Sequence, residues 1–391
     1  MKHLIILITG LFVLSGILAP CLTAQDSAAY ISEFNSYNAL RDRFGVVQDA
    51  VKAGGSATEF YVHALNRLVL EYQNLRGATD IRIAADMATA LARQLGEEGH
   101  TEAGPKLWAL VETMPDPLVK AEALTALGRV QAVDYLPQVV QILTDINSAP
   151  SEDRTGQENI AVGAIRSLEA YKDSSGYLPV FFASTGWYSQ RVKDRAKEAL
   201  PRIMDNPAES LTSVIKGSSY NYAVKYAALQ ALEAAELTAQ LKAAGAVASL
   251  SEAWRTSTST VGQRSILTNT RKLALNMIRR YGTEDANVYP LLERCYKEGS
   301  DTEEQIAAVA ALSALATDDS ATRLSSFLMD INERLRRGTL TQEDERLVRV
   351  IIPALGNTGR PSARPALSSV MRFDWTGAVQ RLAQEALKKI Q

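Results

Sequence analysis

A short apolar pattern that recurs along the chain constrains its fold more than any other feature. A β-branched residue is followed at offsets of four, seven and eight by Ala, Ala and Leu, starting at Val119, Val192, Val224 and Val379. On a helix these offsets form one narrow apolar stripe, with small residues where a neighbouring helix can come close. Such a helix cannot bury itself alone, so the recurrence predicts that it stacks on copies of itself.

The copies can be counted by their closing Leu or Ile, which are 32 to 46 residues apart. This spacing is close to the roughly 40–47 residues of repeats that contain two helices. Prolines at 137, 179, 290 and 365 open further apolar runs, and proline suits the first turn of a helix, where an N–H has no helical partner. The closing residues are Leu91, Leu127, Leu168, Leu200, Leu232, Ile278, Leu315, Leu355 and Leu387.

Two short motifs add a family resemblance. The turn DPLVK at 116–120 and the helix ending ALG at 126–128 and 354–356 resemble the HEAT-repeat family over about residues 57–391. The resemblance implies an all-α protein, a right-handed α-solenoid of about nine antiparallel helix pairs. Armadillo-like repeats and the HEAT-like repeats of phycobilin lyases fit the same pattern, so these alternatives stay open.

The first 24 residues read as an export signal. Lys2 precedes an apolar run at 4–19, and small residues at 22–24 favour cleavage before Gln25. The run is shorter than the roughly 20 residues that span a bilayer. LAPC, which ends at Cys21, is similar to a bacterial lipobox, but Pro20 departs from it, so a lipid anchor is the minor alternative. We expect an exported protein of a bacterial periplasm or cell envelope, of the exported bacterial type within this family.

The mature chain divides into an N-terminal cap at 25–56 and the repeat array at 57–391. The 42 basic and 44 acidic residues of the full sequence nearly balance, which argues against a nucleic-acid partner, because nucleic-acid-binding domains are usually strongly basic. No further apolar run suggests a membrane span. With cleavage before Gln25, Cys295 is the only cysteine left, so an intrachain disulfide is excluded.

Catalytic chemistry has little support in the sequence. His63 and His100 stand alone, and the chain has no HExxH, CxxC, GxSxG or glycine-rich phosphate loop. The adjacent acids Glu303 and Glu304 stand at a helix start, where carboxylates favour the positive end of the dipole. We therefore expect no catalytic residue, no cofactor and no metal site, and that the chain is not an enzyme.

Aromatic residues in two successive turns are the best candidates for partner binding. Trp187 and Tyr188 occupy one turn, and Tyr220, Tyr222 and Tyr226 lie at and after the next. Aromatic side chains with a polar tip are favoured at protein interfaces. The same residues could equally seal two short repeats together.

Basic residues recur at one position of the second helices. Lys193 and Lys225 belong to this row, which also includes Lys120, Arg166 and Lys272. The row could bind an acidic partner, or each cation could meet an acidic residue of a neighbouring turn, which is the interpretation that the near-zero net charge favours.

Two functions follow. The first is a non-enzymatic scaffold or adaptor of the cell envelope that binds a protein or peptide on the concave face of the array, through the aromatic and basic residues just named. The alternative is a lyase-like HEAT enzyme, or an enzyme subunit, that acts on a bound prosthetic group.

Overall fold

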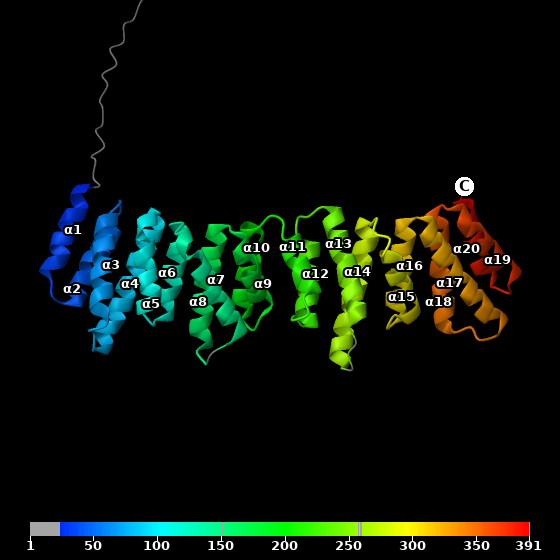
Figure 1. The fold of residues 1–391 in the computed structure, drawn as a ribbon, viewed down its shortest axis with the longest axis horizontal. Coiled ribbons are helices and arrows are strands. Elements are labelled where there is room, and N and C mark those ends of the chain that lie inside the picture. The colour runs from blue at the N-terminus through cyan, green and yellow to red at the C-terminus, as the bar shows by residue number, and fades with distance from the viewer. Residues whose placement is uncertain (1–23, 151, 257, 259, 391) are drawn as a thin grey trace, which may run out of the picture. The chain divides into compact units, whose positions relative to one another are not determined.

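The structure is a computed structural model that describes residues 24–150, 152–256, 258 and 260–390. The predicted export signal, apart from Ala24, lies outside the described residues, as does the alternative lipid attachment at Cys21. Within the described ranges the chain forms twenty α-helices and five short 3₁₀ helices, and no strand occurs there. The prediction of an all-α protein is therefore confirmed (Figure 1).

The chain divides into two compact units. The first comprises the residues up to Lys172 together with 189–195, and the second comprises 173–188 together with the residues from Ala196 onward. The helix α10 (Gln190–Ile203) contributes to both units.

In the first unit, eight helices follow one another as packed pairs. The second members of the pairs pack on each other, α4 on α6 and α6 on α8, and the first members do the same, α1 on α3 and α3 on α5. The predicted cap at 25–56 forms the first of these pairs. The helices are α1 (Ala24–Ser36), α2 (Leu40–Ala53), α3 (Thr58–Tyr72), α4 (Ala78–Glu98), α5 (Gly104–Thr113), α6 (Pro117–Arg129), α7 (Leu136–Ser148) and α8 (Arg154–Tyr171).

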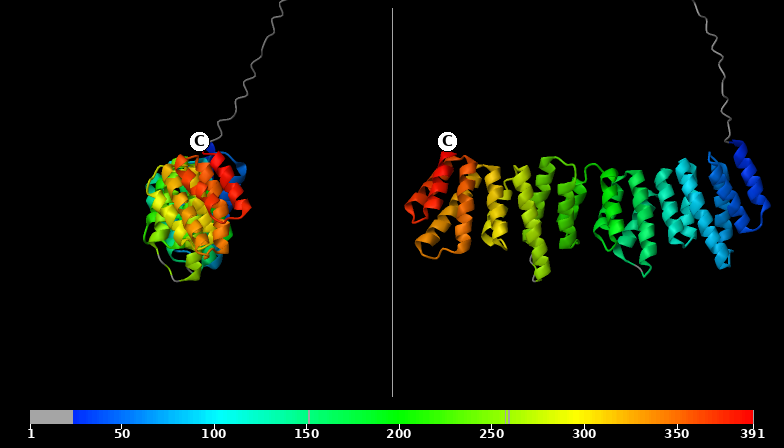
Figure 2. Two further views of the ribbon diagram at one scale, coloured as in Figure 1. Left: turned by 90° about the vertical axis from the view of Figure 1, so that its right-hand side faces the viewer. Right: turned by 180° about the vertical axis from the view of Figure 1, so that it is seen from behind.

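The second unit repeats this arrangement. The row α12, α14, α16, α18 and α20 packs in order, as does the row α11, α13, α15, α17 and α19, and the two rows meet in packed pairs such as α13 with α14 and α17 with α18. This unit is drawn from green to red in Figure 2. Its helices are α9 (Tyr177–Thr185), α11 (Ala208–Lys216), α12 (Tyr222–Ala234), α13 (Ala239–Arg255), α14 (Val261–Tyr281), α15 (Val288–Glu298), α16 (Thr302–Leu315), α17 (Asp318–Arg336), α18 (Gln342–Thr358), α19 (Arg364–Ser369) and α20 (Gly377–Lys388), joined by the last part of α10. From α3 onward the described chain holds eighteen helices, the number that nine pairs require.

Local sequence explains where many helices begin. Asp116 accepts hydrogen bonds from two backbone N–H groups at the start of α6, and Pro117 occupies the first position, where its missing N–H costs nothing. Thr341 and Asp344 form a reciprocal capping box at the start of α18. The four prolines singled out in the sequence all lie in the first turn of α7, α9, α15 or α19.

Glycine and alanine let the second helices come into close contact. A Cβ added to Gly163 of α8 would lie 2.4 Å from the carbonyl oxygen of Ala121, and one added to Gly128 of α6 would lie 2.5 Å from Ser167 Cα. The two helices therefore pack backbone against backbone. The closing residues Leu127 and Leu232 are fully buried, as the stripe predicts.

Candidate partner-binding site

A groove in the second unit combines a large volume with a mostly apolar lining. It has a volume of about 790 Å³ and is lined by α9, the end of α10, and α12. Tyr177 and Phe181 of α9 form one wall, and Leu200 and Met204 face Ala231 of α12. Its volume falls within the range of roughly 300–1,000 Å³ that is usual for ligand sites, which are also mostly apolar.

Small side chains and an early helix end leave this space open. Ala227, Ala231 and Ala234 of α12 carry only a methyl group toward the groove. Pro201 lies inside α10, two residues before the helix ends at Ile203, and it supplies no backbone donor to the last turn. The alanines of α12 thus allow close packing between repeats and also leave room for the groove.

The groove is charged at one end. Asp205 and Glu236 line it just beyond the C-termini of α10 and α12, and helix C-termini carry a partial negative charge. Lys242 Nζ donates a hydrogen bond of 2.6 Å to the carbonyl oxygen of Glu233, and so pairs one of the free carbonyl groups at the C-terminus of α12. Lys197 lines the groove closer to the middle of α10. The end beside Asp205 and Glu236 therefore favours a cationic group.

Of the five aromatic residues proposed from the sequence, Trp187, Tyr188 and Tyr220 take part in two stacked ring pairs. Trp187 and Tyr188 stack on each other with ring centroids 4.2 Å apart. Tyr188 is only 3% exposed and Trp187 is half-buried. Tyr188 therefore offers little ring surface to a partner.

The second pair leads to the groove. Tyr220 stacks on Phe182 with centroids 5.3 Å apart, and Phe182 meets the groove residue Phe181 edge to face at 5.5 Å. Tyr222 and Tyr226 of α12 are half-buried. Only Tyr220 is thus connected to the groove, through two intervening rings.

The two lysines proposed from the sequence have different surroundings. Lys225 is 8% exposed, and its Nζ lies 2.6 Å from Glu252 Oε1 of the next helix. It therefore presents no free ammonium to a partner, and its environment agrees with the structural interpretation of the basic row. Lys193 lies half-buried on the part of α10 that belongs to the first unit.

A second cluster, which the sequence analysis did not identify as a site, joins α13, α14, α15 and α16. Arg271 is 5% exposed and Glu304 is fully buried. Arg271 donates from Nε to Glu304 Oε1 at 2.5 Å and from Nη2 to Oε2 at 3.0 Å. The backbone N–H of Ser300 also donates to Glu304, at 3.0 Å. Glu304 stands in the first turn of α16, as the sequence predicts, and its carboxylate is in addition buried and paired with Arg271.

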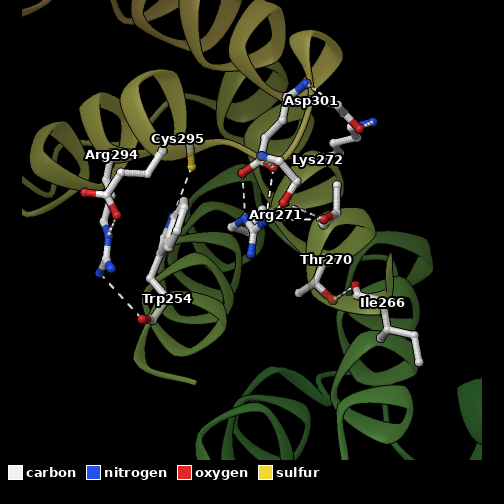
Figure 3. Close-up of polar contacts among 12 residues, drawn as sticks. Trp254, Ile266, Thr270, Arg271, Lys272, Arg294, Cys295 and Asp301 are labelled. Atoms are coloured by element: carbon white, nitrogen blue, oxygen red, sulfur yellow. Dashed lines mark hydrogen bonds and ion pairs between the residues drawn. The ribbon is translucent and has the colours of Figure 1, made fainter. Parts of the chain in front are cut away.

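The indole of Trp254 lies between two guanidinium groups in this cluster (Figure 3). The Cζ atoms of Arg271 and Arg294 are 4.3 Å and 4.4 Å from the ring centre, which is within the range of cation–π attraction. The indole N–H donates to Cys295 Sγ at 3.2 Å. Burial raises the pKa of the Cys295 thiol to about 12, so the thiol stays protonated and its chemical reactivity is low.

Ion pairing and hydrogen bonding therefore account for most of this cluster's polar groups, and its geometry is that of a packed junction between repeats. In the described part of the chain, no three His, Cys, Asp or Glu side chains gather in a way that could hold a metal ion. Over the same residues, no helix combines the length and the apolar character that crossing a bilayer requires.

Comparisons with known proteins give a distant structural likeness. No protein-family model matches the chain, and no curated protein matches it. A solved structure of human deoxyhypusine hydroxylase in complex with glycerol matches over 85% of this chain and 96% of that chain, with 16% sequence identity and a TM-score of 0.27.

This match corrects one expectation. The matched structure is that of an enzyme, so we withdraw the expectation that the chain is not an enzyme. The match assigns no reaction to the chain, because a common fold does not carry a common activity.

Proposed function

We propose that the chain is a HEAT-like α-solenoid of the cell envelope that binds a segment of a protein partner in the groove between α9, α10 and α12. The groove itself carries the proposal, since it combines an apolar floor of about 790 Å³ with charged groups at its edges. Small apolar hollows between helices are a common way to bind a short helix or an extended peptide.

The chemistry of the groove indicates the kind of segment. Leu200, Met204 and the alanines of α12 suit an apolar side chain, while Asp205 and Glu236 suit a neighbouring Lys or Arg of the partner. Methionine adapts to irregular apolar shapes, which helps a groove to accept a flexible side chain. We therefore propose a partner segment with one or two large apolar residues followed by a basic residue.

The experiment uses peptides displayed on phage. A random library is selected on the full chain, and the affinities of selected peptides are measured by fluorescence anisotropy. The proposal expects enrichment of an apolar residue followed by Lys or Arg. Ala234→Trp fills the groove from its exposed edge and should weaken these peptides by about tenfold, or about 1.4 kcal/mol.

The matched control is Ala223→Trp, which adds the same ring to an exposed position in the first turn of α12, outside the groove. It should leave the affinity unchanged. Replacing Asp205 by Asn and Glu236 by Gln should weaken peptides that contain Lys or Arg and should reduce the salt dependence of their binding. Peptides that bind equally well to the wild type and to Ala234→Trp would show that the groove is not the site.

Export is a separate part of the proposal. The apolar run at 4–19 and the small residues before Gln25 support it. N-terminal sequencing of the protein from an envelope fraction should find Gln25 first. A diacylated Cys21 would favour the lipid-anchored alternative, and an uncleaved chain in the cytoplasm would contradict export.

A further inference from the structure

The last part of the chain is strongly basic, in contrast to the rest. Residues 346–391 hold eight Lys or Arg and only two Asp or Glu, whereas the whole chain has 42 basic and 44 acidic residues. The acidic excess therefore lies entirely before residue 346. A charge imbalance confined to one end of a protein indicates a surface that attracts ions of opposite charge.

Two helices bring four of these cations to one surface. Arg364, which begins α19, donates to the carbonyl oxygen of Ile390, just past α20. Since α19 starts shortly after α18 ends, this contact places the C-terminal ends of α18 and α20 together, and the two helices run parallel. Gly356 of α18 lies against Ala386 of α20, and Lys389 Nζ lies 2.9 Å from Asn357 Oδ1 of α18.

Arg349 lies eight residues before Asn357 and Arg381 lies eight residues before Lys389, so the two arginines stand at similar levels of two packed helices. Eight residues of helix correspond to about 12 Å. Arg349, Arg381, Lys388 and Lys389 are all exposed, and we refer to these four residues as the C-terminal basic surface.

Among the residues that the structure describes, no carboxylate forms an ion pair with these four cations. In the part of the chain that the structure describes, Arg346 is the residue of this segment that forms an ion pair, with Glu303. Arg360 and Arg364 donate instead to backbone carbonyl groups. Glu385 is exposed on α20 between Arg381 and Lys389, yet it forms no ion pair with either of them among the described residues.

Helix stability explains only part of this arrangement. Lys388 and Lys389 lie at the C-terminus of α20, where cations favour the negative end of the dipole. Arg349 and Arg381 lie inside their helices, away from either C-terminus. The dipole therefore gives no reason for a cation at these two positions.

We propose that the C-terminal basic surface binds the phosphate-bearing headgroups of an anionic membrane. Between the cations the surface exposes polar side chains such as Asn357 and Gln384, and it lacks the exposed aromatic or aliphatic anchor that is typical of a protein interface. Trp375 is buried and Phe373 is half-buried, so this segment exposes no ring on which bases could stack. Flexible cations without a preformed pocket suit a charged layer of mobile headgroups, where each Lys or Arg strengthens binding by about fivefold.

The test is sedimentation of the full chain with lipid vesicles. Vesicles of phosphatidylcholine mixed with phosphatidylglycerol should bind the protein, whereas pure phosphatidylcholine should not, and salt should weaken the binding. The double variant Arg349→Gln, Arg381→Gln should bind about 25-fold more weakly, since two cations are removed. Circular dichroism of the variant checks that its helices are intact.

The matched control is Arg264→Gln with Arg279→Gln, which removes two exposed cations from α14 of the same unit. It should bind the anionic vesicles as the wild type does. Equal binding to both kinds of vesicle, an equal loss in the control, or tighter binding to a DNA or RNA oligonucleotide than to the anionic vesicles would overturn the proposal.

Discussion

Replacing Glu304 by Gln should destabilise the second unit locally and strongly. The carboxylate is fully buried and accepts two hydrogen bonds from Arg271 and one from the backbone N–H of Ser300. The neutral amide leaves the Arg271 guanidinium charged, buried and without a counter-charge. Breaking a buried ion pair in this way costs about 3–5 kcal/mol.

Hydrogen exchange measured by mass spectrometry suits this prediction, because an array of repeats need not unfold in one step. A cost of 3–5 kcal/mol lowers protection by between about 100-fold and several thousand-fold. The loss of protection should be largest in α13–α16, which carry the cluster, and should decline toward α20.

Two further variants test whether burial and loss of the counter-charge cause the effect. Glu298→Gln makes the same chemical change in an exposed pair with Arg294 and should cost less than about 1 kcal/mol. Replacing Arg271 by Met together with Glu304 by Leu removes both charges and should recover most of the loss, since apolar substitutes for a buried pair are often tolerated. Equal effects of Glu304→Gln and Glu298→Gln, or a double variant less stable than Glu304→Gln, would refute the reasoning.

Three other predictions follow from features described above. Gly163→Ala should lower the free energy of unfolding in urea by about 1–3 kcal/mol, because the new Cβ would collide with the main chain of α6. Gly45→Ala is the control: its Cβ would meet no atom within 4 Å, so it should raise the free energy of unfolding by about 0.4–1 kcal/mol. Equal effects of the two substitutions would contradict the close contact. Burial raises the pKa of Cys295 to about 12, so iodoacetamide should alkylate this thiol only as fast as α15 opens. Rapid labelling of the folded chain would show that the thiol is not buried. Burial raises the pKa of Asp301, but hydrogen bonds from Lys272 and from backbone N–H groups outweigh it and hold the pKa below 3.8, the usual value for an aspartate. The stability that Asp301 contributes is therefore complete above that pH and is lost as the pH falls through the lower pKa of the folded state. Lys272→Met should make acid unfolding of the second unit less steep, and an unchanged pH dependence would contradict the pairing.

The helical architecture followed from the sequence because it depends on local, periodic information. The stripe that ends at Leu127 and Leu232 marks buried positions, and both residues are buried. Proline at 137 or 365 marks a helix start through its own backbone chemistry. The cap at 25–56 had no clear stripe, although the structure shows two helices there.

The groove could not be predicted because it depends on space between helices that are distant in sequence. From the sequence, Ala231 is a small residue of the kind that lets helices pack closely. The structure instead places it on the lining of the groove, together with Met204 just past the end of α10. Lys225 likewise meets Glu252 through packing, at a separation of 27 residues that no periodic pattern marks. The buried ion pair did leave one sign, since Glu304 stands in phase with the apolar residues Ala308 and Leu312 of its helix.

The position of Trp254 between Arg271 and Arg294 also gives the protein an optical label. An indole that is held against two positive charges and a thiol has an absorption and emission that depend on those neighbours. Separation of α13 from α14 or α15 would remove them and change the light that this side chain emits. With Trp108, Trp187 and Trp375 replaced by Phe, the remaining tryptophan would report the opening of this junction in real time, without any attached dye.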